Sequence, residues 1–348
     1  MITVRQEIWD LFTGKVERAS TDRDAWGRVP SRSAGNMRFL EAVVSRYLYQ
    51  LGFRPTYPGG APFAVCLSHD VDVLTISARE KFGSMRRGQL PFEPLGLLRR
   101  EVDPRFSVQH LLDVEQRVAA VSSFYFMALE QGDQDYNYAP IEARDEMTMV
   151  LDAGSEIGLH GGHRAYAEEE VLAAEKQRLA LISGTTLVGY RNHFLRLDLN
   201  NTWKFLERSG FVYDTTYGFS DTVGFRNGMC YPFRPIDPDS GLRMGLLELP
   251  LIYMDATVFF NLKVSEQEAW DLFLRVVDEV RSCAGIMTLL WHNNYMDTRR
   301  GALYERMLAL LASEGVWFST GAQMVEHWMA TGQQDMMETL IDTHLRPN

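Results

Sequence analysis

Short apolar runs alternate with helix-like patterns along most of the chain, starting at residue 63. Phe63–Leu67 and Cys283–Trp291 have the length and apolar content of buried strands, whereas Glu168–Ile182 repeats its apolar residues at helical spacing. The predicted strands are Phe63–Leu67, Ser122–Leu129, Ser155–Leu159, Leu187–Tyr190, Gly210–Tyr213, Leu246–Leu251, Cys283–Trp291 and Val316–Ser319. Strands that alternate with helices indicate parallel βα units, and about seven such units close into a barrel. An open, doubly wound sheet is the alternative.

Two of the predicted helices begin with a capping box, in which Ser or Thr is followed three residues later by Glu or Gln. The two boxes are Ser265-Glu-Gln-Glu268 and Thr320-Gly-Ala-Gln323. The predicted helices are His110–Val121, Glu168–Ile182, Asn200–Ser209, the helix from Ser265 to Arg281, Gly301–Ser313 and Met324–Met329.

Residues 1–60 have a different pattern. They contain two charged, helix-like pieces, Val4–Val16 and Met37–Leu51, and end in the turn-rich sequence Pro55-Thr-Tyr-Pro-Gly-Gly60. We therefore expect an N-terminal helical extension over residues 1–60 and an α/β barrel domain over residues 61–348.

Composition narrows the classes of function. The chain has 348 residues and a net charge of −11, which repels phosphate backbones and argues against nucleic acid as a partner. Cys66, Cys230 and Cys283 are too few and too far apart for a disulfide framework, so we expect buried thiols. No apolar stretch is long enough to span a membrane, and no signal peptide is visible, so we expect a cytoplasmic protein. No glycine-rich nucleotide-binding motif follows a predicted strand.

Polar residues that can do chemistry stand at the ends of the predicted strands. In chain order they are Asp70, Asp72, His160, His163, Arg191, His193, Asp214 and His292. Because the carboxyl ends of parallel strands meet at one rim, we expect these side chains to converge.

The types and spacings of these residues suit a metal-assisted reaction. Asp70 and Asp72, two apart on an extended segment, point the same way, so that one can bind a metal while the other accepts a proton. An Asx-rich turn is the simpler reading of the pair. His160 and His163 flank two glycines that allow the backbone to bend both imidazoles toward one ion. His193 is a third candidate, either as a ligand or as a substrate contact.

The remaining three residues suit supporting roles. His292 can serve as a general acid, because the pKa of histidine lies near neutral pH. Arg191 can pair with a carboxylate at the rim and fix its orientation. Asp214 either orients His292 or caps a turn.

Taken together and in this order, the segments over residues 61–330 resemble the polysaccharide deacetylase family (carbohydrate esterase family 4, the nodulation-factor deacetylase homology domain). Asp70 and Asp72 match the family's Asp pair, here with one residue between them. Glu156-Ile-Gly-Leu-His160 resembles the second motif, whose usual second histidine position holds Arg164 in this chain, one residue after His163.

The later motifs also have counterparts. Arg191-Asn-His-Phe194 resembles the family's Arg-x-Pro-aromatic motif without its proline. Tyr213-Asp214 resembles the fourth motif, and Leu289-Leu-Trp-His292 resembles the last one.

This resemblance implies a distorted (β/α)7 barrel and a metal-dependent hydrolase. It implies a divalent metal such as Zn²⁺, held by Asp72, by His160 and by either His163 or His193. Asp70 would be the catalytic base, held by Arg191. His292 would be the acid, tuned by Asp214. The substrate would be a carbohydrate carrying an N-acetyl or O-acetyl group, and the expected location in the cell favours an intermediate of bacterial surface polysaccharide synthesis such as O-antigen.

Three other functions remain open at this stage. The first is another amide hydrolase on the same fold, of the allantoinase kind. The second is a barrel that has lost its metal and only binds glycan. The third is a partner subunit in polysaccharide assembly, in which residues 1–60 and the stretch Ser77–Phe106 serve as docking surfaces; solvated loops and helix faces are the simpler reading of both.

Overall fold

The protein is described by a computed structural model over residues 2–74, 104–296 and 298–347. The described residues form one nine-stranded sheet, in the order β6-β5-β4-β3-β2-β1-β8-β7, with β9 paired to β1. The strands are β1 (Ala64–Val71), β2 (Ser123–Met127), β3 (Glu156–Gly161), β4 (Gly189–Asn192), β5 (Tyr213–Asp214), β6 (Leu247–Glu248), β7 (Leu251–Met254), β8 (Ile286–Leu290) and β9 (Trp317–Ser319). All eight strand pairs are parallel, and the sheet curls, which confirms the predicted α/β barrel over the open sheet.

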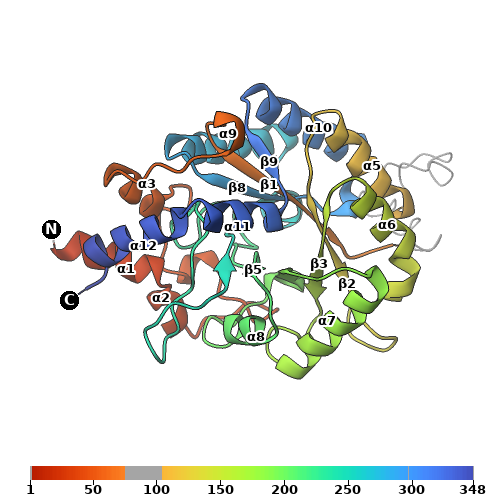
Figure 1. Ribbon diagram of the computed structural model, residues 1–348, viewed down its shortest axis with the longest axis horizontal. Coiled ribbons are helices and arrows are strands. Elements are labelled where there is room, and N and C mark those ends of the chain that lie inside the picture. Colours follow the sequence, from red (N-terminus) through yellow and green to blue (C-terminus); the bar gives the residue numbers. More distant parts are fainter. Residues whose placement is uncertain (1, 75–103, 297, 348) are drawn as a thin grey trace.

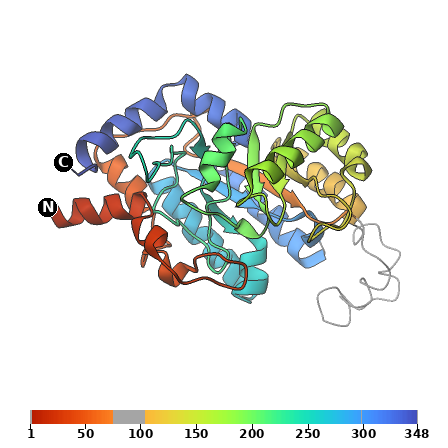
Figure 2. The same ribbon diagram turned by 90° about the horizontal axis from the view of Figure 1, so that it is seen from below.

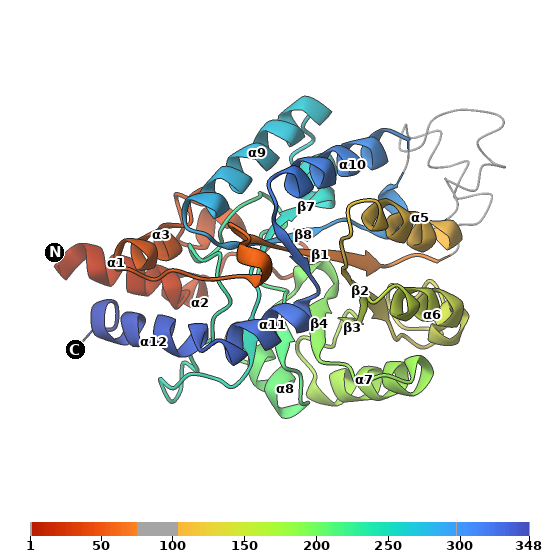
Figure 3. The ribbon, with the colours of Figure 1, turned by 45° about the horizontal axis from the view of Figure 1, so that its top comes forward.

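Helices surround this sheet (Figures 1 and 3). They are α5 (Pro104–Gln116), α6 (Arg144–Asp152), α7 (Glu169–Ser183), α8 (Thr202–Arg208), α9 (Glu266–Ser282), α10 (Thr298–Ser313), α11 (Gly321–Ala330) and α12 (Gln333–His344). Both predicted capping boxes are present: the Ser265 hydroxyl accepts from Glu268 N at the start of α9, and the Thr320 hydroxyl accepts from Gln323 N at the start of α11. The sequence patterns did not predict α6 or α12.

The N-terminal extension packs into the same hydrophobic core as the barrel. It contains α1 (Ile2–Phe12), α2 (Lys15–Ala19) and α3 (Val43–Gln50). Phe12 and Leu48 are buried in the main core cluster. Both ends of the chain lie on one side of the molecule (Figure 2), where Arg5 donates from Nη2 to Thr343 O at 3.2 Å.

Three further expectations can be compared with the structure. Cys66, Cys230 and Cys283 are all buried free thiols, as predicted. Within the described residues, no helix is both long enough and apolar enough to cross a membrane. The candidate docking stretch Ser77–Phe106 lies almost entirely outside the described residues.

Candidate metal centre and active site

Strand β1 delivers two aspartates to the rim of the barrel. Asp70 lies in the last part of β1, where it pairs with Tyr125 of β2, and Asp72 follows directly after the strand. Asp70 is buried, and its Oδ1 accepts a hydrogen bond from Arg191 Nη1 at 2.9 Å. Arg191 is itself fully buried and also donates to the Ser68 hydroxyl at 2.9 Å. The guanidinium therefore compensates the buried carboxylate and fixes its orientation.

His69, which precedes Asp70 in β1, does not belong to the site. Side chains alternate along a strand, so His69 points away from Asp70 into the core. Its Nε2 lies 2.7 Å from Glu115 Oε1, and its Nδ1 lies 2.7 Å from Trp291 O. Tyr304 donates to the same Glu115 oxygen at 2.6 Å. This buried network ties the end of β1 to the segment that precedes His292.

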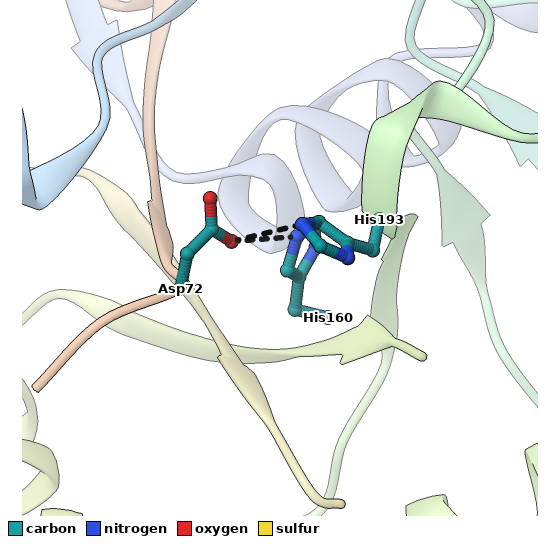
Figure 4. A group of neighbouring side chains, drawn as sticks. All are labelled: Asp72, His160 and His193. Atoms are coloured by element: carbon teal, nitrogen blue, oxygen red, sulfur yellow. Dashed lines mark ion pairs between the residues drawn. The ribbon is translucent and has the colours of Figure 1, made fainter. Parts of the chain in front are cut away.

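Three potential metal ligands converge beside Asp70. Asp72 Oδ1 lies 3.1 Å from His160 Nε2 and 3.9 Å from His193 Nε2. Figure 4 marks these two ion pairs with dashed lines. One ligand atom from each of Asp72, His160 and His193 lies within 4.8 Å of the other two. His160 comes from the end of β3, and His193 follows β4. One carboxylate and two imidazoles form a ligand set found in catalytic zinc sites, which leave a position open for water.

The hydrogen bonding of His160 and Asp72 leaves the atoms that would bind a metal ion available to it. His160 Nδ1 lies 3.0 Å from Arg191 O, and because a carbonyl only accepts, Nδ1 carries a hydrogen; in the neutral ring Nε2 then has the lone pair that a metal ion needs. His160 Nε2 and Asp72 Oδ1 are both buried and lie 3.1 Å from each other, and neither makes a well-oriented hydrogen bond with a described residue. Buried polar atoms with so few partners are costly. A divalent cation would satisfy both atoms.

The electrostatics also favour a cation. Burial would raise the pKa of Asp72, but the neighbouring imidazoles of His193 and His160 outweigh it and hold that pKa well below its ordinary value. Burial opposes protonation of His160, whereas Asp70 and Asp72 raise its pKa. The same carboxylates attract a metal ion.

The structure places His163 outside the cluster that contains the other candidate ligands. Its Nδ1 lies 3.3 Å from Asp135 Oδ2, and His193 Nδ1 lies 3.4 Å from the same oxygen. The side chain of His163 lines a separate cavity of about 220 Å³ with Glu175 and Arg178. β3 ends at Gly161, and the chain then turns the imidazole of His163 toward Asp135, so the geometry favours His193 over His163 as the third ligand.

His292 faces the same site, held by an aspartate that the sequence did not single out. Its Nδ1 lies 2.6 Å from Asp255 Oδ1, and its backbone N–H donates to Asp255 Oδ2 at 2.6 Å. Its Nε2 lies 3.7 Å from Asp72 Oδ2 and 4.0 Å from Asp70 Oδ2. Burial opposes the charge on His292, but Asp255 and the two rim aspartates outweigh it and raise the pKa of His292 to about 10.

Asp214 makes no hydrogen bond to His292, and of the two roles expected for it, its contacts match the turn cap. Its Oδ1 accepts from Thr216 N at 3.0 Å, and its Oδ2 accepts from Trp203 Nε1 at 3.0 Å. Glu248 Oε2 accepts from the same indole at 3.0 Å. Asp214 lies at the end of β5, and four strands lie between β5 and β8 in the order of the sheet. Asp255 follows β7, which lies next to β8, and is near enough to His292.

A cleft of about 210 Å³ opens beside the candidate metal ligands and His292. Asp70, Asp72, His193 and His292 contribute polar groups to it. Arg28 and Asn261 also line it, and the remaining lining residues are apolar or aromatic: Trp26, Phe194, Leu195, Met254, Ala256, Phe260 and Tyr295. A concave site with an apolar wall and a few convergent polar groups is typical of a small-molecule or sugar site.

Known proteins similar to this chain are found by comparison of structures but not by comparison of sequences. Neither protein-family models nor curated proteins match the sequence. Among solved structures, a protein from Mycobacterium smegmatis described as a polysaccharide deacetylase aligns with a TM-score of 0.57 at 21% identity, over 80% of this chain and 94% of that chain.

Two further likenesses are weaker. A pseudoenzyme of carbohydrate esterase family 4 from Bacillus anthracis aligns with a TM-score of 0.43 at 10% identity, over 76% of this chain and 66% of that one. A family 4 carbohydrate esterase from Streptomyces lividans in complex with acetate aligns with a TM-score of 0.39 at 12% identity, over 74% of this chain and 92% of that one. Both are too distant to inform function. On the strength of the Mycobacterium smegmatis structure, this chain has the distorted (β/α)7 barrel fold of the polysaccharide deacetylases.

Proposed function

We propose that the protein is a metal-dependent deacetylase that removes an acetyl group from a carbohydrate, by hydrolysis of an N-acetyl amide. One observation carries the proposal: Asp72, His160 and His193 converge in a cleft that also contains an Arg-held aspartate and an Asp-held histidine. The set comprises a metal site, a base and an acid, which amide hydrolysis requires.

Asp72, His160 and His193 would hold the metal, and Zn²⁺ suits their mixture of nitrogen and oxygen donors. When bound, a divalent cation supplies polarisation of the amide carbonyl and a lower pKa for the attacking water. Asp135 faces Nδ1 of His193, and the carbonyl of Arg191 faces Nδ1 of His160. These contacts keep Nε2 of each imidazole directed at Asp72.

Asp70 is the proposed base. Its Oδ1 is engaged by Arg191, and its Oδ2 lies 3.7 Å from His160 Nε2, on the side of the metal ligands. Because Arg191 stabilises the ionised carboxylate, Asp70 is available to accept a proton from water at the carbonyl carbon.

His292 is the proposed acid. Asp255 fixes the ring so that Nε2 faces Asp70 and Asp72 across the cleft. A histidine in this position donates a proton from Nε2 to the leaving nitrogen as the carbon–nitrogen bond breaks, and acetate and the free amine are the products.

A carbohydrate substrate is supported by the aromatic side chains beside the polar groups of the cleft. We place this substrate among the intermediates of bacterial surface polysaccharide synthesis. The stated alternatives make different predictions: an allantoinase-like enzyme opens a ring and releases no acetate, and an inactive barrel binds glycan without turnover.

The test is acetate release from a panel of N-acetylated sugars and oligosaccharides, with allantoin alongside, before and after chelation and after Zn²⁺ is restored. The proposal expects acetate from at least one sugar, loss of activity with chelator and recovery with metal. Ring opening of allantoin without acetate release would support the first alternative. Glycan binding without turnover in the metal-loaded protein would support the second.

A further inference from the structure

A segment of the N-terminal extension forms part of the wall of the active-site cleft. Trp26 and Arg28, between α2 and α3, line the cleft together with Asp70, Asp72 and His292. The indole of Trp26 stacks on the ring of Phe194, with centroids 3.9 Å apart and an interplanar angle of 18°. Although one of its faces covers Phe194, Trp26 is still 36% exposed. The indole therefore retains accessible surface at the cleft.

Local hydrogen bonds hold Trp26 in this position. Asp24 Oδ1 accepts from the backbone N–H groups of both Trp26 and Arg28 at 2.9 Å. Asp24 Oδ2 pairs with Arg28 Nε at 2.7 Å, and Arg28 Nη1 donates to Phe194 O at 2.8 Å. A carboxylate that accepts from the N–H groups two and four residues further along the chain makes a compact Asx-type turn. The turn is thus fixed to the backbone that follows His193.

The segment is also anchored at both ends. On the side of α2, Glu17 forms a buried ion pair with Arg226 and accepts from the Tyr217 hydroxyl at 3.0 Å. On the other side, Ser31 donates from both its N and its hydroxyl to Asp221 Oδ2 at 3.0 Å. Since Glu17 and Arg226 are only 2% and 4% exposed, separating them would leave an uncompensated buried charge.

A second aromatic pair lines the same cleft. Phe260 and Tyr295 have ring centroids 4.9 Å apart at an interplanar angle of 35°, and Tyr295 lies 5.3 Å from the ring of His292. The carboxylates of Asp70 and Asp72 line the cleft between the proposed acid, His292, and the His193 side. The cleft therefore offers aromatic faces on both the acid side and the metal-ligand side.

Trp26 is separated from His193 by one ring, that of Phe194. The ring centroids of His193 and Phe194 lie 3.9 Å apart, and those of Phe194 and Trp26 lie 3.9 Å apart. A group that contacts Trp26 therefore lies beyond the acetyl group that would react beside Asp72. Aromatic rings offer flat apolar faces with a negative quadrupole, against which the polarised C–H face of a pyranose packs.

We propose that Trp26 is a substrate-contacting residue that forms a stacking subsite for a second sugar ring, adjacent to the one that carries the acetyl group. The inference rests on the proposed deacetylase function and deepens it, because it makes the substrate at least a disaccharide. The N-terminal extension then belongs to the substrate site and selects for chain length.

The experiment compares Trp26→Ala and Trp26→Phe with the wild-type protein on N-acetylated oligosaccharides of one, two, three and four rings. Acetate release gives kcat and KM, titration calorimetry gives Kd, and metal analysis gives the ion content. Loss of one aromatic stack should raise KM and Kd for two rings and longer about tenfold in the alanine variant. The effect on the single sugar and on kcat should be smaller, metal content should be unchanged, and phenylalanine should restore most of the affinity.

Met37→Ala is the matched control, because Met37 belongs to the same extension and is 84% exposed but does not line the cleft. Its constants should equal those of the wild type. Unchanged Kd and KM at every chain length in Trp26→Ala would overturn the inference. So would loss of metal from that variant, since this would reveal a role in positioning His193 instead.

Failure of the proposed function is distinguishable. If the wild-type protein releases no acetate, the deacetylase assignment fails, and calorimetry with the same oligosaccharides still decides the role of Trp26. Weaker binding by Trp26→Ala than by wild type would then support the stacking subsite. Equal binding, or no binding by either protein, would overturn it.

Discussion

Asp255 binds both the ring and the backbone of His292. Its Oδ1 lies 2.6 Å from Nδ1, and its Oδ2 accepts from the backbone N–H at 2.6 Å. Both contacts come from one fully buried carboxylate, so the ring orientation and the chain position of His292 are fixed together. The arrangement stabilises a positive imidazolium and directs Nε2 into the cleft.

The first prediction follows from this pair. Asp255→Asn should lower kcat for acetate release by about 100-fold or more, because the amide no longer stabilises the charged ring of the acid. Metal content should be unchanged, since Asp255 lies outside the ligand cluster. Asp214→Asn is the matched control: it alters a buried aspartate at the end of another strand, β5, that makes no contact with His292, so its kcat should stay close to that of the wild type. Equal effects of the two substitutions on kcat would contradict the assignment of Asp255.

The second prediction concerns the metal ligands. His193→Ala should lose most of the bound metal, because it removes one of the three converging ligand atoms. His163→Ala should keep the metal, since its Nδ1 faces Asp135. Elemental analysis of both variants after dialysis against Zn²⁺ makes the comparison, and His160→Ala provides a reference that should lose both metal and activity. Metal loss from the His163 variant with retention by the His193 variant would reverse the ligand assignment.

The third prediction separates base from ligand. Asp70→Asn should reduce kcat by roughly 100- to 10,000-fold while it leaves metal bound, because an amide cannot accept the proton from water. Arg191 would then lose its ionised partner, so the same variant should also be less stable. Elemental analysis, acetate release and thermal unfolding measure the three quantities. An Asp70→Asn variant with normal turnover would remove Asp70 from the mechanism.

The fourth prediction concerns stability rather than activity. Burial raises the pKa of Glu248 well above its ordinary value of 4.5, and the neighbouring Asp214 raises it further. Between the ordinary pKa of the unfolded chain and the raised pKa of the folded protein, Glu248 holds a proton in the folded state that it releases on unfolding. The free energy of unfolding therefore falls as the pH rises through this range. The slope is at most about 1.4 kcal/mol per pH unit for one proton.

Glu248→Gln mimics the protonated side chain and should remove this slope. We expect the free energy of unfolding of the variant to gain on that of the wild type as the pH is raised from about 5 to about 8. Denaturant unfolding at several pH values measures the difference. Parallel curves for the two proteins would show that Glu248 does not hold the proton in the folded state.

The fold could be predicted from the sequence because the pattern that indicates it, apolar runs that alternate with helices, recurs along the chain. Buried strands such as β1 and β8 produce apolar runs, and the helices between them keep a separate period, so the alternation survives errors in single elements. The rim residues followed from the same pattern. Asp70, Asp72, His160 and His292 could be placed together because parallel strands deliver their carboxyl ends to one edge.

Other features depend on loop geometry that residue spacing does not encode. The predicted strand Leu246–Leu251 is two strands, β6 and β7, which flank Pro250; proline has no N–H to give to a ladder. Asp255 was missed for this reason, since β7 was not recognised as a separate strand. An aspartate directly after the apolar run Leu251–Met254 was the available signal. Nothing in the spacing placed Trp26 near the rim.

The left-handed backbone of Phe194 and Leu195, with φ values of 58° and 54°, has a consequence for how this barrel can change. Residues with side chains pay about 1–2 kcal/mol each for that conformation, so the turn after His193 depends on outside support. Arg28 provides it through the hydrogen bond from its Nη1 to Phe194 O. A truncated variant without the first 60 residues would need glycine at position 194, at position 195 or at both to keep His193 in place. Engineers who trim this chain should therefore redesign the two regions as a unit.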